Sequence, residues 1–221
     1  MMKNKPSPSD SFLFKRPGIT AKNRIVLAAM TNKQSHDNGT ISQAEIKWLA
    51  RRAIGGFGII TTAATHVAKH GQGWEGEFGV FDDSHKSNLS LLAKSIHSYD
   101  SLIIAQLFHG GARSPQDLTG MQPISASVIN SNESHNGYTY AASEKDIEKI
   151  IKDFTSAAIR CAESGLDGIE LHGAHGYLLS QFLGKETNMR TDKWGGSFKN
   201  NSRLLFDIYK SIKNNVHDSF I

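Results

Sequence analysis

The sequence predicts an α/β protein built on a parallel β-sheet, and three observations lead to this fold class. Apolar runs of strand length alternate with stretches of helical periodicity, four times along the chain. A helix between successive strands favours parallel pairing with right-handed crossovers. Polar side chains, Thr31, Gln106 and His172, close three of the four strands, and barrel enzymes carry their sites at these strand ends.

Four strands are predicted from the apolar runs. They span residues 23–31, 57–64, 102–109 and 168–172. In the last strand Ile169 and Leu171 share one face, while Glu170 and His172 share the other, because side chains alternate along a strand. This strand breaks at Gly173, so its polar face leads directly into the loop that follows.

Four helices are predicted between and after the strands. They cover residues 42–55, 89–96, 143–165 and 204–212. The first and third begin with capping boxes, Ser42-x-x-Glu45 and Ser143-x-x-Asp146, and both end at glycine. The third has the clearest apolar stripe, which includes Cys161.

Three segments carry no helix or strand pattern. Residues 1–22 are predicted as an irregular lead-in to one domain that covers residues 23–221. Residues 71–79 contain four glycines without the lysine and spacing of a phosphate-binding loop, so we predict an ordinary flexible loop. Residues 110–142 are polar and predicted as a loop over one face.

Composition restricts the class of protein. The 221 residues suffice for one domain, and 38% hydrophobic with 21% charged residues is typical of soluble proteins. The net charge is +4, but the 25 Lys and Arg are spread along the chain, which argues against a nucleic-acid partner. No stretch approaches the ~20 apolar residues of a membrane span. One cysteine and the absence of a signal-peptide pattern predict a cytoplasmic location.

Three ionisable side chains lie within six residues at the end of the fourth strand: His172, His175 and Tyr177. Two imidazoles and a phenol at a strand end are typical of a reaction site at the mouth of a barrel. A His at such a position is more often structural, and His-x-x-His could also bind a metal ion. A metal site needs further ligands, and Cys161 lies in a helix stripe, so we favour hydrogen-bonding chemistry without a metal.

The number of β/α units leaves two architectures open. A closed barrel needs eight units, whereas this chain supplies four and stops at Ile221, where a fifth strand would begin. The chain is therefore either an open four-stranded sheet or the N-terminal half of a barrel.

Four sequence blocks decide between them. They are Asn23-Arg-Ile-Val with Ala29-Met-Thr31, Gln106-Leu-Phe-His-Gly-Gly111, Leu171-His-Gly-Ala-His-Gly-Tyr-Leu-Leu-Ser-Gln-Phe182 and Arg190-Thr-Asp-Lys-Trp-Gly-Gly-Ser197. In these blocks the sequence resembles the old yellow enzyme family of FMN-dependent NADH:flavin oxidoreductases, which are (β/α)8 TIM barrels. The resemblance implies that about the first four units of such a barrel are present. It also implies hydride transfer from NAD(P)H through FMN to an activated alkene, such as an α,β-unsaturated carbonyl compound.

The resemblance also implies roles for single residues. His172 and His175 match the pair that hydrogen-bonds the substrate carbonyl oxygen, and Tyr177 matches a tyrosine that protonates the α-carbon in parts of the family. Five residues match positions that contact the flavin: Ala29, Met30, Thr31, Ala64 and Gln106. Among these, Thr31 corresponds to a hydroxyl or thiol beside the flavin C4 carbonyl, and Gln106 to a partner of the pyrimidine edge.

The sequence departs from the family pattern in three places. Ala29 stands where relatives often have proline, and residues 198–201 lack the usual Asn-Arg pair. The third departure is that these 221 residues do not include the second half of the barrel, which in the family supplies an arginine and the FMN phosphate site. We therefore expect this chain to bind FMN weakly or not at all by itself, and to pair with itself or with a missing C-terminal half.

Two further interpretations stay open from the sequence. One is a non-catalytic remnant or half-barrel subunit that needs a partner to bind FMN. The other is an unrelated phosphate-binding barrel enzyme, which should have a lysine or carboxylate in place of His172 and His175.

Overall fold

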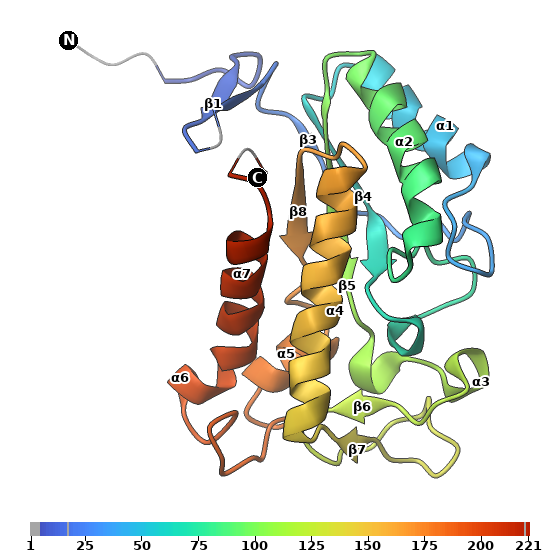
Figure 1. Ribbon diagram of the computed structural model, residues 1–221, viewed down its shortest axis with the longest axis vertical. Coiled ribbons are helices and arrows are strands. Elements are labelled where there is room, and N and C mark those ends of the chain that lie inside the picture. Colours follow the sequence, from blue (N-terminus) through green and yellow to red (C-terminus); the bar gives the residue numbers. More distant parts are fainter. Residues whose placement is uncertain (1–4, 17, 219) are drawn as a thin grey trace.

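A computed structural model describes residues 5–16, 18–218 and 220–221, and its centre is a four-stranded sheet (Figure 1). The strands are β3 (Val26–Leu27), β4 (Ile59–His66), β5 (Leu102–Phe108) and β8 (Gly168–Leu171). They lie in this order and every pair is parallel. The predicted parallel sheet is confirmed, with each crossover joining neighbouring strands.

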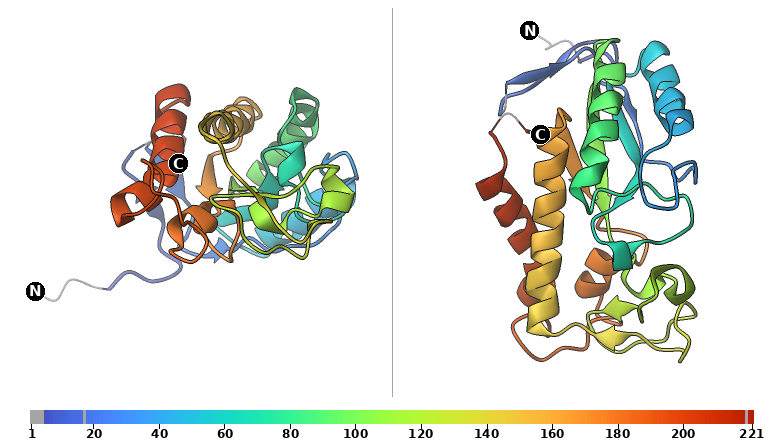
Figure 2. Two further views of the ribbon diagram at one scale, coloured as in Figure 1. Left: turned by 90° about the horizontal axis from the view of Figure 1, so that it is seen from below. Right: turned by 45° about the vertical axis from the view of Figure 1, so that its right-hand side comes forward.

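Four long helices cover one face of this sheet. They are α1 (Gln43–Ile54), α2 (Lys86–His97), α4 (Glu144–Glu163) and α7 (Arg203–Asn215). Figure 2 shows α2, α4 and α7 side by side on the same side of the strands. Their apolar stripes form the core with the outward-facing strand residues, for example Phe154 and Ile208 with Ile103 and Leu107, all fully buried.

The other face of the sheet is partly uncovered along β3, β5 and β8, whereas β4 is buried on both faces. Val26 on this face is 48% exposed, and Ile104 and Gln106 are half-buried. Parallel sheets normally have both faces covered, because the strands are apolar on both sides. A partly uncovered inner face beside a complete outer layer of helices is what the interior of a partial barrel presents.

A β-bulge in β4 changes which side chains face inward. Thr61 pairs with Ile104 and Ala64 with Gln106, so β4 contains one extra residue between these pairs. Thr62 in the bulge accepts a hydrogen bond at Oγ1 from the Gln106 N–H (3.2 Å). Bulges re-aim side chains next to active sites, and this one turns Ala64 onto the inner face.

Two predicted segments near the N-terminus differ from the structure. The lead-in is not irregular throughout, because β1 (Phe12–Phe14) and β2 (Ile19–Ala21) form an antiparallel hairpin. The predicted strand over residues 23–31 is paired only at Val26–Leu27. This strand lies at the edge of the sheet, and the residues after it leave the ladder to run past the strand ends.

Residues 71–79 form a loop, as predicted, and backbone hydrogen bonds join this loop to the end of β4. The segment begins with η1 (Lys69–Gly71) and turns back onto the end of β4. His66 donates its N–H to the Phe78 carbonyl and accepts from the Val80 N–H, both at 3.0 Å. These backbone partners and the buried Phe78 side chain hold the end of the loop, residues 78–80, against β4.

Several short elements surround the carboxyl ends of the strands (Figure 1). They are η2 (Asp83–His85), η3 (Gly111–Arg113), α3 (Gln116–Thr119), β6 (Ile124–Ser125), β7 (Tyr140–Ala141), α5 (Leu178–Leu183) and α6 (Phe198–Asn201). The stretch predicted as a loop over one face, residues 110–142, holds four of them. Within the described residues, no helix is long and apolar enough to cross a membrane.

Candidate active site

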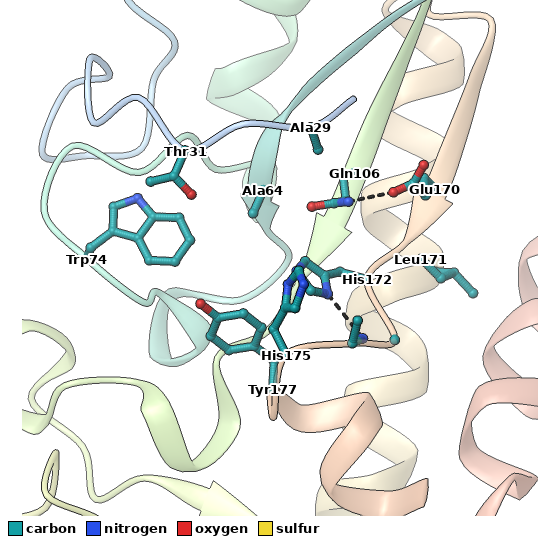
Figure 3. A pocket seen from close by; sticks show the side chains of 12 residues that line it. Ala29, Thr31, Ala64, Trp74, Gln106, Glu170, Leu171, His172, His175 and Tyr177 are labelled. Atoms are coloured by element: carbon teal, nitrogen blue, oxygen red, sulfur yellow. Dashed lines mark hydrogen bonds between the residues drawn. The ribbon is translucent and has the colours of Figure 1, made fainter. Parts of the chain in front are cut away.

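A pocket of about 400 Å³ lies where the four strands end (Figure 3). Seven of the eight residues named from the sequence line it: Ala29, Thr31, Ala64, Gln106, His172, His175 and Tyr177. The eighth, Met30, does not line it and is 44% exposed. Ala29 and Thr31 face the pocket, so Met30 between them points elsewhere, as alternation in an extended segment requires.

Five further residues line the pocket: Trp74, Glu170, Leu171, Gly173 and Ala174. Four of these belong to the same strand end and turn as His172, and Glu170 was already expected on the His172 face. Trp74 comes from the segment predicted to be flexible. The one sequence feature that could have indicated Trp74 is its position in a glycine-rich stretch that follows a strand.

His172 is held in one neutral form. Its side chain is buried, and Nδ1 accepts a hydrogen bond from the Ala174 N–H (3.3 Å). Burial lowers the pKa of His172, and the neighbouring His175 lowers it further. A neutral ring that accepts at Nδ1 carries its proton on Nε2, so His172 offers one N–H donor.

His175 reaches the pocket through a left-handed turn. Its φ is 58° and that of Gly176 is 73°, and the His175 carbonyl accepts from Arg113 Nη1 (2.9 Å). The rings of His172 and His175 are 5.2 Å apart between centroids, with their planes at 76°. The end of β8 and the left-handed turn after it therefore place both imidazoles in the same pocket.

One buried aromatic side chain contacts three of the rings that line the pocket. Phe108, fully buried at the end of β5, lies 5.6 Å from the His172 ring, 4.5 Å from Tyr177 and 5.3 Å from Trp74 between centroids. Edge-to-face contacts of this kind fix ring orientations. The Arg113 guanidinium lies 4.7 Å from the Tyr177 ring on the same cluster.

Gln106 and Glu170 pair across β5 and β8 on the inner face. Gln106 Nε2 donates to Glu170 Oε1, which leaves the amide oxygen of Gln106 directed into the pocket (Figure 3). Gln106 therefore presents a hydrogen-bond acceptor, while Thr31 presents a hydroxyl on another side of the same space.

The described part of the chain contains no group of three or more His, Cys, Asp or Glu side chains arranged to hold a metal ion. His172 and His175 thus face the pocket without a third such ligand beside them. Cys161 is buried in α4, where burial raises the pKa of its thiol to about 12.

Comparison with known proteins shows the family. The sequence profile of the NADH:flavin oxidoreductase / NADH oxidase family matches residues 14–221. The chain belongs to this family. It is 38% identical over 201 residues to a probable NADH-dependent flavin oxidoreductase, YqiG, of Bacillus subtilis, and covers 52% of that protein. It is 34% identical over 205 residues to an NADH:acrylate oxidoreductase of Vibrio harveyi, covering 92% of this chain and 20% of that protein.

Solved structures of the family agree with the fold. The old yellow enzyme homologue from Zymomonas mobilis aligns with a TM-score of 0.87 and 29% identity, over 95% of this chain and 60% of that chain. The resemblance to the old yellow enzyme family and the partial TIM barrel are thereby confirmed. The chain spans about half the length of the YqiG relative that it matches.

The pocket residues fit a flavin ring. Ala29 and Ala64 have side chains of one carbon, which leaves room for a flat ring beside the strand ends. The Gln106 amide oxygen suits a ring N–H, and the Thr31 hydroxyl suits a ring carbonyl. This set of donors and acceptors matches the pyrimidine half of a flavin, which has both groups on adjacent atoms.

Proposed function

We propose that this chain forms part of an FMN-dependent NAD(P)H oxidoreductase that reduces activated alkenes such as α,β-unsaturated carbonyl compounds. The observation that carries the proposal is the pair of imidazoles, with His172 as a neutral Nε2–H donor, in the pocket that also presents Gln106 and Thr31. The relative named for acrylate, an activated alkene, supports this substrate class.

His172 and His175 act on the substrate carbonyl oxygen in this proposal. Negative charge grows on this oxygen when a hydride reaches the β-carbon, and preorganised donors aimed at it lower the barrier. A neutral His172 donates through its Nε2–H, and the hydrogen bond from the Ala174 N–H to Nδ1 keeps the ring oriented. Tyr177 supplies the proton for the α-carbon from its phenol, held in place by Phe108 and Arg113.

Ala29, Thr31, Ala64 and Gln106 hold the cofactor in this proposal. Bound FMN would accept a hydride from NAD(P)H and deliver it to the alkene. A Thr31 hydroxyl beside a flavin carbonyl would favour the electron-rich, reduced form. Met30 does not line the pocket, so its contact with the flavin stays a prediction from the resemblance alone.

The test is an absorbance spectrum of the purified chain after FMN is added and excess is removed, followed by turnover of NADPH with an enone. Retained flavin with enone consumption supports the proposal. Retained flavin that NADH and NADPH bleach, without consumption of any enone offered, contradicts the alkene substrate. A chain that binds no FMN alone, yet binds it when a C-terminal half-barrel is added, places the function in the assembled barrel.

A second candidate is a half-barrel subunit that acquires the cofactor only with a partner. The observation favouring it is an apolar pocket of about 280 Å³ beside β8, lined by Ile169, Leu171, Tyr209, Ile212 and Phe220 among others. Apolar surface of this kind marks a place where another element packs. Light scattering of the chain with and without the C-terminal half of a relative separates the two candidates.

A further inference from the structure

Trp74 stands on one side of the pocket, together with Thr31, while Gln106, Glu170 and Leu171 stand on the other (Figure 3). Its indole packs against Phe108, which also contacts His172 and Tyr177. A ligand that reaches both imidazoles therefore has to fit within the space that Trp74 bounds.

The backbone that carries Trp74 is anchored by a buried carboxyl group. The Glu77 side chain is fully buried, and its Oε2 accepts the N–H of Gly73 at 2.6 Å. Gln72 Nε2 donates to the Trp74 carbonyl at 3.0 Å. Trp74 is therefore held by bonds to the residues on both sides of it, rather than by its own side chain alone.

The Trp74 segment is also joined to the segment that carries Thr31. Ser35 donates its N–H to the Gly76 carbonyl at 3.0 Å. Gly76 has a φ of 67°, and a Cβ there would lie 2.7 Å from the Lys33 carbonyl oxygen, so only glycine permits this approach. The two segments thus form one wall of the pocket.

A second buried carboxyl group holds the Thr31 side of this wall. Glu45, fully buried on α1, accepts from Asn32 Nδ2 (3.0 Å) and from the Ser35 hydroxyl. Its side chain does not return to Ser42, so the capping box expected at this helix forms only the Ser42 half. The Glu45 carboxyl group accepts hydrogen bonds from the wall, at Asn32 and Ser35, and not from the backbone N–H of Ser42.

We propose that Trp74 limits the size of the carbonyl ligand that the His172–His175 pair can take, and that Glu77 is the positioning residue for Trp74. This inference rests on the proposed function for the identity of the ligand. Substituents on the side of the ligand that faces Trp74 collide with the indole, because Phe108 behind it and the Glu77 bond to Gly73 prevent its retreat.

The positioning role is tested by ¹⁹F NMR of the whole chain labelled with 5-fluorotryptophan. The three tryptophans give three lines, assigned by single Trp→Phe variants. Glu77→Ala is expected to shift and broaden the Trp74 line only. Glu77→Gln is expected to restore it, because an amide oxygen can still accept the Gly73 N–H and burial raises the pKa of Glu77 toward a neutral carboxyl. The control Glu75→Gln changes an exposed neighbour and should leave the line unchanged.

An unchanged Trp74 line in Glu77→Ala overturns the positioning role, whatever the activity. Loss of all three lines at their folded positions would show unfolding, and the Glu77→Gln spectrum then decides: a wild-type Trp74 line supports the role, and a displaced one overturns it.

The size limit is tested by binding of 2-cyclohexen-1-one and its 4,4-dimethyl analogue in a barrel completed by its C-terminal half, once its absorbance shows that FMN is bound. Binding is followed by the ring C–H signals of His172 and His175. Trp74→Ala is expected to tighten binding of the dimethyl ketone by roughly tenfold relative to the smaller ketone, the scale of a methyl-group mismatch in a pocket. An unchanged ratio, or no response of either histidine to either ketone in both proteins, overturns the size limit.

These outcomes separate the two proposals. Selective binding without any turnover would contradict the proposed function and leave the role of Trp74 standing. Turnover with an unchanged ratio of affinities in Trp74→Ala would contradict the size limit alone.

Discussion

At the scale of single residues, the site depends on a histidine that stays uncharged. His172 is shielded from water, its Nδ1 is occupied by the Ala174 N–H, and burial lowers its pKa. These three features fix both the protonation state and the direction of the remaining N–H. A donor fixed in advance is more effective than one that must reorient during the reaction.

Removal of this donor is expected to slow the reaction with the alkene. In a barrel completed by its C-terminal half, His172→Ala should slow enone consumption. The expected rise in the activation barrier is about 3 kcal/mol, the scale of one lost oxyanion donor. Stopped-flow absorbance measures this rate. Bleaching of the flavin by NAD(P)H serves as the control and should change less; equal rates of enone consumption in both proteins would remove His172 from the proposed role.

A second histidine makes stability depend on pH. His66 is fully buried, stacks on Phe81 and has a pKa lowered to about 3, first by burial and then by the nearby His85. The unfolded chain binds a proton below its ordinary pKa of 6.5, whereas the folded chain does not until about pH 3. This contribution to stability is therefore complete above pH 6.5 and is lost as the pH falls toward 3.

Urea unfolding of the wild type and His66→Gln at pH 7 and pH 5 measures this effect. The advantage of the wild type over the variant should shrink by about 2 kcal/mol between the two pH values. The raised pKa of Glu77 has the opposite sign and weakens the fold as the pH rises above 4.5. Glu77 Oε2 lies 3.7 Å from His66 Nδ1, so the two proteins are compared in a Glu77→Gln background as well. His36→Gln, at an exposed histidine, should show no such change.

At the scale of elements, the bulge in β4 connects local stability to the site. Thr62 Oγ1 takes the place of a backbone acceptor for the N–H of Gln106, and the side chain of the same Gln106 lines the pocket. Neighbouring Thr61 has a buried hydroxyl that makes no hydrogen bond within the described structure. Two adjacent buried threonines therefore differ in one respect: the hydroxyl of Thr62 is hydrogen-bonded and that of Thr61 is not.

Thr62→Val should destabilise the chain by about 1–3 kcal/mol, since it leaves the Gln106 N–H without its acceptor. Thr61→Val removes an unpaired hydroxyl and should be neutral or stabilising. Thermal unfolding of both variants checks the difference. Equal losses in the two proteins would show that packing, not the hydrogen bond, holds the bulge.

The bulge also shows where prediction from sequence reaches its limit. Periodicity located all four long helices and the cores of β4, β5 and β8, because these elements bury regular apolar faces. Strict alternation from Thr61 would have placed Ala63 inward. The resemblance named Ala64 instead, and the shifted ladder gives the physical reason. The edge strand was predicted too long for a similar reason, since the residues after Leu27 leave the ladder while β4 continues to His66.

The site was predictable to the extent that local sequence determines it. His172, His175 and Tyr177 follow one strand, so one short stretch carries all three. Trp74 could not be found this way, because its place in the pocket depends on a carboxyl group and a turn that bring a distant segment back. Met30 was assigned to the cofactor by resemblance, although the chain turns it outward.

At the scale of the whole molecule, four helices cover the outer face of the sheet, whereas the inner face is partly open. Val26 and Glu170 on the inner face remain exposed. A separate apolar pocket lies between β8 and α7. Uncovered sheet faces and edges promote association, because they offer both apolar area and unpaired backbone groups.

We expect the purified chain to associate with itself as its concentration rises. Sedimentation velocity over a hundredfold range of concentration measures this. Val26→Lys places a charge on the edge strand and inner face, and should weaken the association without a loss of helix signal in circular dichroism. A wild-type chain that stays monomeric over the whole range would show that its open face is tolerated in water.

The left-handed turn at His175 has a consequence for any library of variants at this position. Only glycine, and to a lesser extent Asn, Asp and His, adopt this backbone at small cost, whereas β-branched side chains do not. A saturation screen would therefore discard Val, Ile and Thr through misfolding before their chemistry was sampled. Enrichment of Asn over Gly among the survivors would measure the need for a donor, since these two residues share the backbone and differ in the amide.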